Sequence, residues 1–399
     1  MDARALLDHL RARRGAMLDV LADLVGRESP SRDKGALDAL ASVLAERLRA
    51  LGGRVERIEN ARGGDHLRAR FEAPGEKNIR PPVLVLGHFD TVWPLGTRDD
   101  RPFAIEGGRA SGPGVFDMKA SLMLLEFAIA AIRALDLARP RPVVVLWTSD
   151  EEIGSPTSRR LIEEQAGESA FVLVLESPLP GGRLKTARKG VGQFTVTIEG
   201  RAAHAGIEPE RGVSAIQELA HQILSLQRLG NPSAGTTVNV GVVQGGTTPN
   251  VVAARATARV DVRVASLDEA RRIEGAMRAL RPATAGASVS ATGLFIRPPM
   301  ERTPQVVALF EQARTIGRSL GLELDEGSTG GASDGNFTAA LGVPTLDGLG
   351  AEGGGAHAEG EYILIDSLPE RAALLASLIL GLTPPGRATP RGHEPPGVA

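Results

Sequence analysis

The chain has 399 residues, and its 46 basic and 48 acidic side chains nearly cancel to a formal net charge of −2. This balance, without a long run of one sign, argues against nucleic-acid and anionic-membrane partners, and no apolar stretch approaches the roughly 18–20 residues needed to cross a bilayer. The absence of cysteine excludes disulfides, thiol nucleophiles and cysteine metal ligands, so any metal must be held by His, Asp and Glu.

The first half of the chain alternates helical patterns with continuous apolar runs. Its first 25 residues carry leucines at helical spacing interleaved with charges, which predicts a helix and a mature cytoplasmic N-terminus rather than a signal peptide. Further helices are indicated between Leu37 and Leu51 and from about Met118. Apolar runs lie between the helical patterns, at 81–88, 141–149 and 171–176. Continuous Val/Leu runs separated by helices indicate a parallel sheet that is covered on both faces.

From Gly190 the pattern changes to segments in which apolar and polar residues alternate. These segments lie at 191–200, 236–243, 256–264 and 287–295. Two helical patterns fall between them, near Val213–Arg228 and Leu267–Leu280. The order strand, helix, strand, strand, helix, strand predicts a ferredoxin-like α+β unit, with its helices on one face of an antiparallel sheet.

We therefore expect an α/β chain with an inserted domain. Residues 1–189 and 297–382 form the first domain, because helical patterns resume at 303–321 and at 367–382. The insert at 190–296 forms a lid. Residues 383–399 are rich in Pro and Gly without large apolar residues, which predicts a disordered tail.

The segment LVLGHFDTVWPLG places His88 and Asp90 just after a strand predicted over Val83–Leu86. Alternate side chains of an extended segment point the same way, so both groups share a face. A metal-ligating imidazole normally has its second ring nitrogen held by a carboxylate. The pair predicts a metal ligand, His88, with Asp90 as its orienting partner, although a strand-end turn with two solvated polar groups explains this stretch alone equally well.

Further acidic and imidazole residues stand at strand exits or beside glycine turns. They are Asp117 in ASGPGVFDMKASL, Asp150, Glu151 and Glu152 in VVVLWTSDEEIGS, Glu176 in FVLVLESP and His357 in GGGAHAEGEY. In a parallel sheet, three of these groups project from the carboxyl edge, where open α/β sheets place their sites. Each alone is more often a helix cap or a solvated acid, but together in a cysteine-free chain they predict one converging site.

Two histidines with several carboxylates suit two zinc-like ions. Each ion takes one imidazole, one terminal carboxylate and a shared bridging carboxylate, with a position left for water. We expect Asp117 to be the bridge. The side chains of Glu151 and Glu152 leave the backbone in different directions, so one can bind metal while the other acts as general base toward the water.

These residues stand in motifs that resemble a known family. The motifs GHFDTV, GVFDMK, SDEEIGS, ESP, RAAHAG, GGASDGNF and GGGAHAEGE, in that order between about residues 15 and 382, resemble the co-catalytic di-zinc metallopeptidase family of glutamate carboxypeptidase, acetylornithine deacetylase, succinyl-diaminopimelate desuccinylase and aminoacylase. The resemblance implies a zinc-peptidase-like domain with a doubly covered mixed sheet, and a ferredoxin-like lid that dimerises. It also implies two Zn²⁺ ions per subunit, with Co²⁺ or Mn²⁺ as alternative metals.

The resemblance assigns roles to individual residues. Carried over by motif, the metal ligands are His88, Asp117, Glu152, Glu176 and His357. Glu151 becomes the general base, and Asp90 the orienter of His88. Glu176 favours the glutamate carboxypeptidase branch, of carboxypeptidase G type, since dipeptidases and aminoacylases tend to have aspartate there. His204 in RAAHAG matches a histidine that reaches across a lid-to-lid homodimer and stabilises the oxyanion in the other subunit's active site, although a histidine between alanines is more often a packed or solvated loop residue.

Substrate-binding groups are predicted mainly on the lid. VDVRV puts Arg263 on the polar face of a strand, and its guanidinium fork suits a substrate carboxylate. The resemblance adds Asn250 in TTPNVV and Arg297 in FIRPP. The glycines of STGGASDGN would let backbone amides near Ala332 approach a substrate carboxylate at a helix start.

The expected activity is zinc-dependent hydrolysis of an amide bond next to a free α-carboxylate, in a small peptide or an N-acyl amino acid. Glu151 would move a proton from water to the leaving amine. An N-acyl amino acid deacylase and a dipeptidase of the same family are the alternatives within this class. A non-catalytic metal- or peptide-binding module is the alternative from another class, and Glu151 counts against it because this carboxylate has no structural duty if Glu152 binds the metal.

Overall fold

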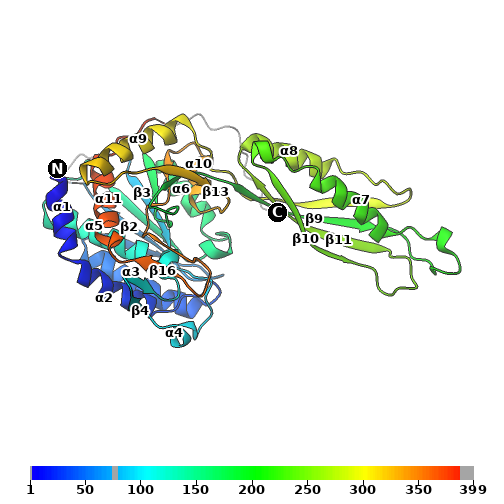
Figure 1. Ribbon diagram of the computed structural model, residues 1–399, viewed down its shortest axis with the longest axis horizontal. Helices are drawn as coiled ribbons and strands as arrows, with labels where there is room; N and C mark the ends of the chain where they lie inside the picture. Colours follow the sequence, from blue (N-terminus) through cyan, green and yellow to red (C-terminus); the bar gives the residue numbers. More distant parts are fainter. Residues whose placement is uncertain (1, 74–79, 387–399) are drawn as a thin grey trace. The chain divides into compact units, whose positions relative to one another are not determined.

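A computed structural model of the chain describes residues 2–73 and 80–386. Contacts between these residues divide the chain into two compact units, which are described separately (Figure 1). Unit 1 is the described part of Met1–Thr186, Arg302–Thr329 and Ser333–Ala399, and unit 2 is Ala187–Glu301 with Gly330–Ala332. Most of the tail predicted at 383–399 lies outside the described residues.

A six-stranded mixed sheet forms the centre of unit 1 (Figure 1). In spatial order its strands are β1 (Arg54–Ile58), β2 (His66–Phe71), β6 (Val143–Thr148), β3 (Val83–His88), β7 (Phe171–Val174) and β14 (Thr345–Leu346). Strands β6, β3, β7 and β14 run parallel, whereas β2 pairs antiparallel with both β1 and β6. The carboxyl ends of the parallel strands therefore meet at one edge, where distant segments of the chain can bring side chains together.

Helices cover both faces of this sheet. The α-helices of unit 1 are α1 (Ala3–Arg11), α2 (Arg14–Val25), α3 (Lys34–Ala50), α4 (Thr97–Asp100), α5 (Ala120–Ala134), α6 (Arg159–Glu168), α9 (Pro304–Ser319), α10 (Gly335–Ala340) and α11 (Ser367–Gly381). Val83 and Val85 belong to the large core cluster that includes α1, α2, α3, α5 and α11. Leu84 and Leu86 belong to a second cluster with residues of α6 and α10. Because alternate residues of one strand enter opposite cores, the strand reads as a continuous apolar run.

Smaller elements complete unit 1. Strands β4 (Ala104–Glu106), β5 (Arg109–Ser111), β16 (Tyr362–Leu364) and β15 (Gly353–Gly354) form a second sheet, and β8 (Leu184–Arg188) pairs with β13 (Glu326–Thr329). A short irregular helical segment spans Val115–Lys119, and a single 3₁₀ turn spans Glu151–Ile153. Both segments carry acidic residues that the sequence places at the candidate site.

Unit 2 is a four-stranded antiparallel sheet with two helices on one face (Figure 1). Its elements are the strands β10 (Thr237–Gly245), β11 (Arg255–Val264), β9 (Gly190–Glu199) and β12 (Ser288–Arg297) in spatial order, the helices α7 (Ala215–Gln227) and α8 (Leu267–Arg278), and the 3₁₀ turns Pro209–Arg211 and Pro232–Ala234. Val196, Ile198, Val260 and Val262 pack against the helices, while the residues between them face the other way. Period-two alternation therefore produces a sheet with one covered face.

The predicted fold class is confirmed, namely a mixed α/β unit with an inserted ferredoxin-like unit. The sheet is mixed, as the resemblance implied, because the polar and largely exposed strand β1 and its neighbour β2 join the parallel strands antiparallel. The helix predicted from about Met118 begins at Ala120, since Asp117 and Met118 have non-helical backbone angles. Within residues 2–73 and 80–386, no helix is both long enough and apolar enough to span a bilayer.

Candidate metal centre

His88, the last residue of β3, directs one ring nitrogen at two carboxylates. Its Nδ1 lies 3.0 Å from the main-chain oxygen of Asp90. Its Nε2 lies 3.2 Å from Asp117 Oδ1 and 3.5 Å from Glu176 Oε1. A carbonyl oxygen only accepts hydrogen bonds, so Nδ1 carries a hydrogen and Nε2 is the nitrogen offered to the acids.

His357 approaches Asp117 from a different segment of the chain. Its Nε2 lies 3.3 Å from Asp117 Oδ2 and 3.0 Å from Glu152 Oε2. The two oxygens of Asp117 therefore face two different imidazoles, Oδ1 facing His88 and Oδ2 facing His357. The side chain of His357 is 52% exposed, whereas that of His88 is 2% exposed, so the cluster is closed at β3 and open at the His357 loop.

The acids and imidazoles of this cluster shift one another's pKa values. Hydrogen bonds to Asp117 and Glu152 raise the pKa of His357 to about 10. Burial disfavours charge on His88, but hydrogen bonds to Asp117 and Asp90 raise its pKa well above the usual range. Burial also opposes charge on Asp117, but hydrogen bonds from both imidazoles hold its pKa well below the usual range, while burial raises the pKa of Glu152. The cluster strongly favours positive charge, which is the property of a cation site.

The side-chain carboxylate of Asp90 holds the backbone amides of the Glu151–Glu152 doublet. Its Oδ1 accepts a hydrogen bond from Glu151 N, and its Oδ2 accepts one from Glu152 N, both at 3.1 Å. Oδ2 also accepts from Ser31 Oγ at 2.8 Å. Asp90 is fully buried, and its Oδ1 lies 3.4 Å from His88 Nδ1. One carboxylate thus connects the strand end that carries His88 to the turn that carries both glutamates.

A second network, which the sequence does not reveal, supports the same turn. Asp150 accepts hydrogen bonds from Thr157 N at 2.7 Å and from Ser158 Oγ at 2.5 Å. The buried ring of His66 lies 3.1 Å from Thr157 Oγ1 and 3.1 Å from Ser149 Oγ. His66 and Thr157 are 91 residues apart and stand in no motif, so only the folded chain identifies them as neighbours.

The donor set suits divalent cations. Two groups each offer three ligand atoms that lie within 4.8 Å of one another, namely His88, Glu151 and Glu176 in one group and His88, Asp117 and Glu152 in the other. Imidazole nitrogens and carboxylate oxygens are ligands of Zn²⁺, and they also accept Co²⁺ or Mn²⁺. The carboxylates are mostly buried and repel one another, and a bound cation relieves that repulsion.

His204 and Asn250 lie on neighbouring loops of unit 2. Ala205 N donates to the Asn250 main-chain oxygen at 2.9 Å, and His204 forms an antiparallel bridge with Val251. Gly206 N donates to His204 Nδ1 at 3.1 Å, so in the neutral ring Nε2 carries the hydrogen. His204 is exposed, and its ring presents an N–H donor at the surface of unit 2.

The remaining substrate-binding candidates also belong to unit 2. Arg263 donates from Nε and Nη2 to the Asp261 carboxylate, at 2.9 and 3.1 Å, so its guanidinium fork is engaged within the lid. Arg297 is the last residue of β12 and is buried. Ala332 lies in the short segment after β13 that belongs to unit 2. The metal-ligand candidates are thus in unit 1 and the substrate-binding candidates in unit 2.

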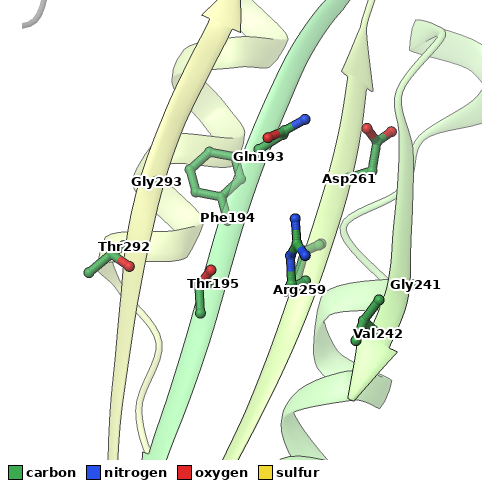
Figure 2. Close-up of a pocket in the computed structure, with 10 residues that line it drawn as sticks. Gln193, Phe194, Thr195, Gly241, Val242, Arg259, Asp261, Thr292 and Gly293 are labelled. Carbon is green, nitrogen blue, oxygen red and sulfur yellow. The ribbon is translucent and has the colours of Figure 1, made fainter. Parts of the chain in front are cut away.

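The uncovered face of the lid sheet carries a hollow of about 430 Å³ (Figure 2). Its lining comes from all four strands and includes Gln193, Thr195, Arg259, Asp261 and Thr292. The candidate metal ligands are not among its lining residues. The hollow is a feature of the sheet surface and contains no imidazole, so we assign it no part in the reaction.

Comparison with known proteins identifies the family. The sequence profile of Peptidase family M20/M25/M40 matches residues 84–381. Carboxypeptidase G2 from Pseudomonas sp. (strain RS-16) is 29% identical over 383 residues, which cover 92% of this chain and 89% of the relative. Aminopeptidase PepT from Bacillus cereus ATCC 10987 shares the fold, with a TM-score of 0.73 at 23% identity over 92% of this chain and 98% of that chain.

A second solved structure with this fold is the Bacillus subtilis YXEP protein, a dinuclear metal binding peptidase from the M20 family. Its TM-score is 0.69 at 15% identity, over 93% of this chain and 98% of that chain. The family resemblance inferred from the motifs is confirmed by the profile match. Because that match covers most of the chain and spans every candidate metal ligand, the chain belongs to Peptidase family M20/M25/M40.

Proposed function

We propose that this peptidase is a metal-dependent enzyme of the carboxypeptidase type, which hydrolyses the amide bond next to a free C-terminal amino acid. The observation that carries the proposal is the position of Asp117, whose two oxygens face the imidazoles of His88 and His357. The carboxypeptidase type is supported by similarity to carboxypeptidase G2 along 92% of the chain. A family peptidase with this cluster has the donors for two cations in one site.

Zn²⁺ is the proposed metal, with two ions per subunit. The proposed ligands are His88, Asp117, Glu152, Glu176 and His357. When bound, two such cations act as Lewis acids, which polarise a carbonyl group and lower the pKa of water. Asp117 is the proposed bridge because each of its oxygens has its own imidazole neighbour.

Glu151 is the proposed general base. Its backbone N–H donates to Asp90 Oδ1, and one of its carboxylate oxygens lies within 4.8 Å of ligand atoms of His88 and Glu176. The carboxylate takes a proton from the attacking water and passes it to the amide nitrogen as the C–N bond breaks. The products are a carboxylate and a free amine. Glu152, on the same turn, is placed as a metal ligand, because its carboxylate lies beside the imidazole of His357, another proposed ligand.

Unit 2 is proposed to recognise the free α-carboxylate of the substrate. Arg263, Arg297 and the backbone near Ala332 offer cationic or N–H groups, and Asn250 offers an amide side chain. The fork of Arg263 is engaged by Asp261, so a substrate carboxylate would have to replace Asp261 there. The substrate class is therefore a small peptide or an N-acyl amino acid with a free carboxyl end.

We also propose a homodimer formed through unit 2, in which His204 of one protomer acts in the active site of the other. Strand β10 is an edge strand of the lid sheet, and its Val242 and Val243 are 45% and 54% exposed. Ile216 and Leu224 of helix α7 are also exposed. Apolar side chains on an edge strand and a neighbouring helix favour burial against a second copy. The Nε2–H of His204 is the kind of donor that stabilises a developing oxyanion.

A substrate panel on Zn²⁺-loaded protein tests the proposed activity. The panel contains folyl-glutamate, acetyl-ornithine, other N-acyl amino acids and dipeptides, ranked by kcat/KM. We expect the highest value for folyl-glutamate. A higher value for other N-acyl amino acids or for dipeptides would make the protein a deacylase or a dipeptidase. No turnover of any compound with both ions bound would favour a binding module.

A further inference from the structure

Glu361 is a buried glutamate on which four N–H donors converge. Only 2% of its surface is exposed. Its Oε1 accepts hydrogen bonds from Phe116 N at 2.8 Å and from Asp117 N at 3.0 Å. Its Oε2 accepts from Gly114 N and from Trp93 Nε1, both at 2.9 Å. One carboxylate thus ties together the loop after β3, the segment before α5 and the loop before β16.

The segment that Glu361 holds has no regular helical geometry. It runs through Val115–Lys119, in which Asp117 has φ −120° and ψ 90°, and Met118 has φ −138° and ψ 37°. Buried backbone amides outside a regular helix or strand have no ladder partner, so they need another acceptor. Glu361 supplies that acceptor for Phe116 and Asp117, and the backbone position of Asp117 therefore depends on it.

The loop that carries Glu361 also carries a metal-ligand candidate. His357 precedes Glu361 by four residues, and Glu361 N donates to Ala358 O at 3.1 Å within the turn between them. The imidazole of His357 lies 3.3 Å from Asp117 Oδ2. The loop therefore contacts Asp117 twice, at the carboxylate through His357 and at the amide through Glu361.

We propose that Glu361 is a positioning residue for the two-metal site. By fixing the amide of Asp117, it sets the direction of the bridging carboxylate and thereby the affinity for the two cations. The proposal rests on the proposed function, because it takes Asp117 as the bridge. Groups that hold a metal ligand in place typically change metal affinity by about 10–100-fold when they are replaced.

The test substitution is Glu361→Gln, which keeps the side-chain size but turns one acceptor oxygen into an NH₂ group that faces N–H donors. Metal-free protein is titrated with Zn²⁺ against a competing chelator, and with Co²⁺ by visible absorption. We expect the wild type to bind two ions, and Glu361→Gln to bind the weaker ion at least about 10-fold less tightly, with a changed Co²⁺ spectrum. Glu359→Gln, at an exposed position of the same loop, is the matched control and should bind like the wild type.

Thermal unfolding of the metal-free proteins separates positioning from general stability. A Glu361→Gln protein with a lowered Tm but wild-type Zn²⁺ affinity and Co²⁺ spectrum would overturn the proposal, because Glu361 would then only stabilise the fold. If this variant does not fold, Glu361→Asp replaces it, since aspartate keeps the charge but withdraws the carboxylate by one methylene. We expect Glu361→Asp to weaken the same ion by a smaller factor, and wild-type affinity would overturn the proposal.

Two further outcomes are informative. Failure of both variants to fold would also overturn the proposal, because Glu361 would then be required for the fold rather than for the metals. A wild-type protein that binds fewer than two ions would instead overturn the two-metal site itself.

Discussion

Replacing Asp90 by asparagine is expected to separate the strand end that carries His88 from the turn that carries the two glutamates. The Asp90 carboxylate accepts hydrogen bonds from Glu151 N and Glu152 N at 3.1 Å. It also accepts one from Ser31 Oγ at 2.8 Å. Asparagine keeps one acceptor oxygen, but its NH₂ group faces N–H or O–H donors at the other position. At least one buried donor is therefore left without a partner.

The size of the effect follows from these contacts. A hydrogen bond to a charged acceptor is worth about 1.5–3 kcal/mol, and an unpaired buried donor costs about 1–3 kcal/mol. We therefore expect Asp90→Asn to lower the free energy of unfolding by about 2–4 kcal/mol. Movement of the turn also displaces the Glu152 carboxylate, so we expect Zn²⁺ affinity to fall about 10–100-fold.

Urea unfolding of metal-free protein and Zn²⁺ titration measure the two effects separately. Ser31→Ala is the matched control, because it removes only the hydroxyl donor to the carboxylate and should cost about 1.5–3 kcal/mol with little change in Zn²⁺ affinity. An Asp90→Asn protein that unfolds like the wild type, or that unfolds more easily but binds Zn²⁺ normally, would contradict this role of Asp90.

Three further predictions concern pH, metal and assembly. Burial raises the pKa of Asp65, but hydrogen bonds from lysine, arginine and backbone donors outweigh it and lower the pKa to about 2. The stabilisation by this carboxylate is therefore present above the unfolded pKa near 4 and is lost as pH falls through 2. In urea unfolding, the stability advantage of wild type over Asp65→Asn, on the order of 1–2 kcal/mol at pH 6, should shrink progressively between pH 4 and 2. A chelator should abolish hydrolysis, because it removes the cations. It should also lower the Tm measured by calorimetry, because the carboxylates of Asp117 and Glu152 then repel each other. Added Zn²⁺ should restore both the rate and the Tm, and an unchanged rate and Tm after chelation would contradict this. Inactive His204→Ala and Glu151→Gln homodimers should regain activity when their subunits are exchanged, and no recovery under verified exchange would exclude the action of His204 in trans.

The parts of the fold and site that the sequence predicts are those that regular strands determine. A buried strand such as β3 fixes the face and exit direction of its last residues, so His88 could be recognised as a group delivered to the sheet edge. The same reasoning applies to Glu176, which follows β7. The lid could be predicted because its strands have one covered face and therefore alternate strictly.

The parts that could not be predicted depend on contacts between irregular segments. Glu361 accepts a hydrogen bond from the amide of Phe116, 245 residues earlier, and no local pattern reports such a contact. The sequence pointed to Asp90 as the partner of His88 but gave no sign of its bonds to the Glu151 amide and to Ser31. Strands of two or three residues, such as β15 and β16, are too short to show an alternation, so the second sheet of unit 1 was not foreseen.

We propose that the turn after β6 carries the general base and a metal ligand side by side, as Glu151 and Glu152. The most direct test measures metal content by elemental analysis and turnover by kcat in Glu151→Gln and Glu152→Gln. We expect Glu151→Gln to retain two metal ions and to lose turnover by about 10²–10⁴-fold or more, because it removes the base and spares the ligands. We expect Glu152→Gln to lose metal, since its carboxylate lies 3.0 Å from His357 Nε2 within the cluster. Loss of metal in Glu151→Gln together with full occupancy in Glu152→Gln would contradict the assignment and reverse the two roles.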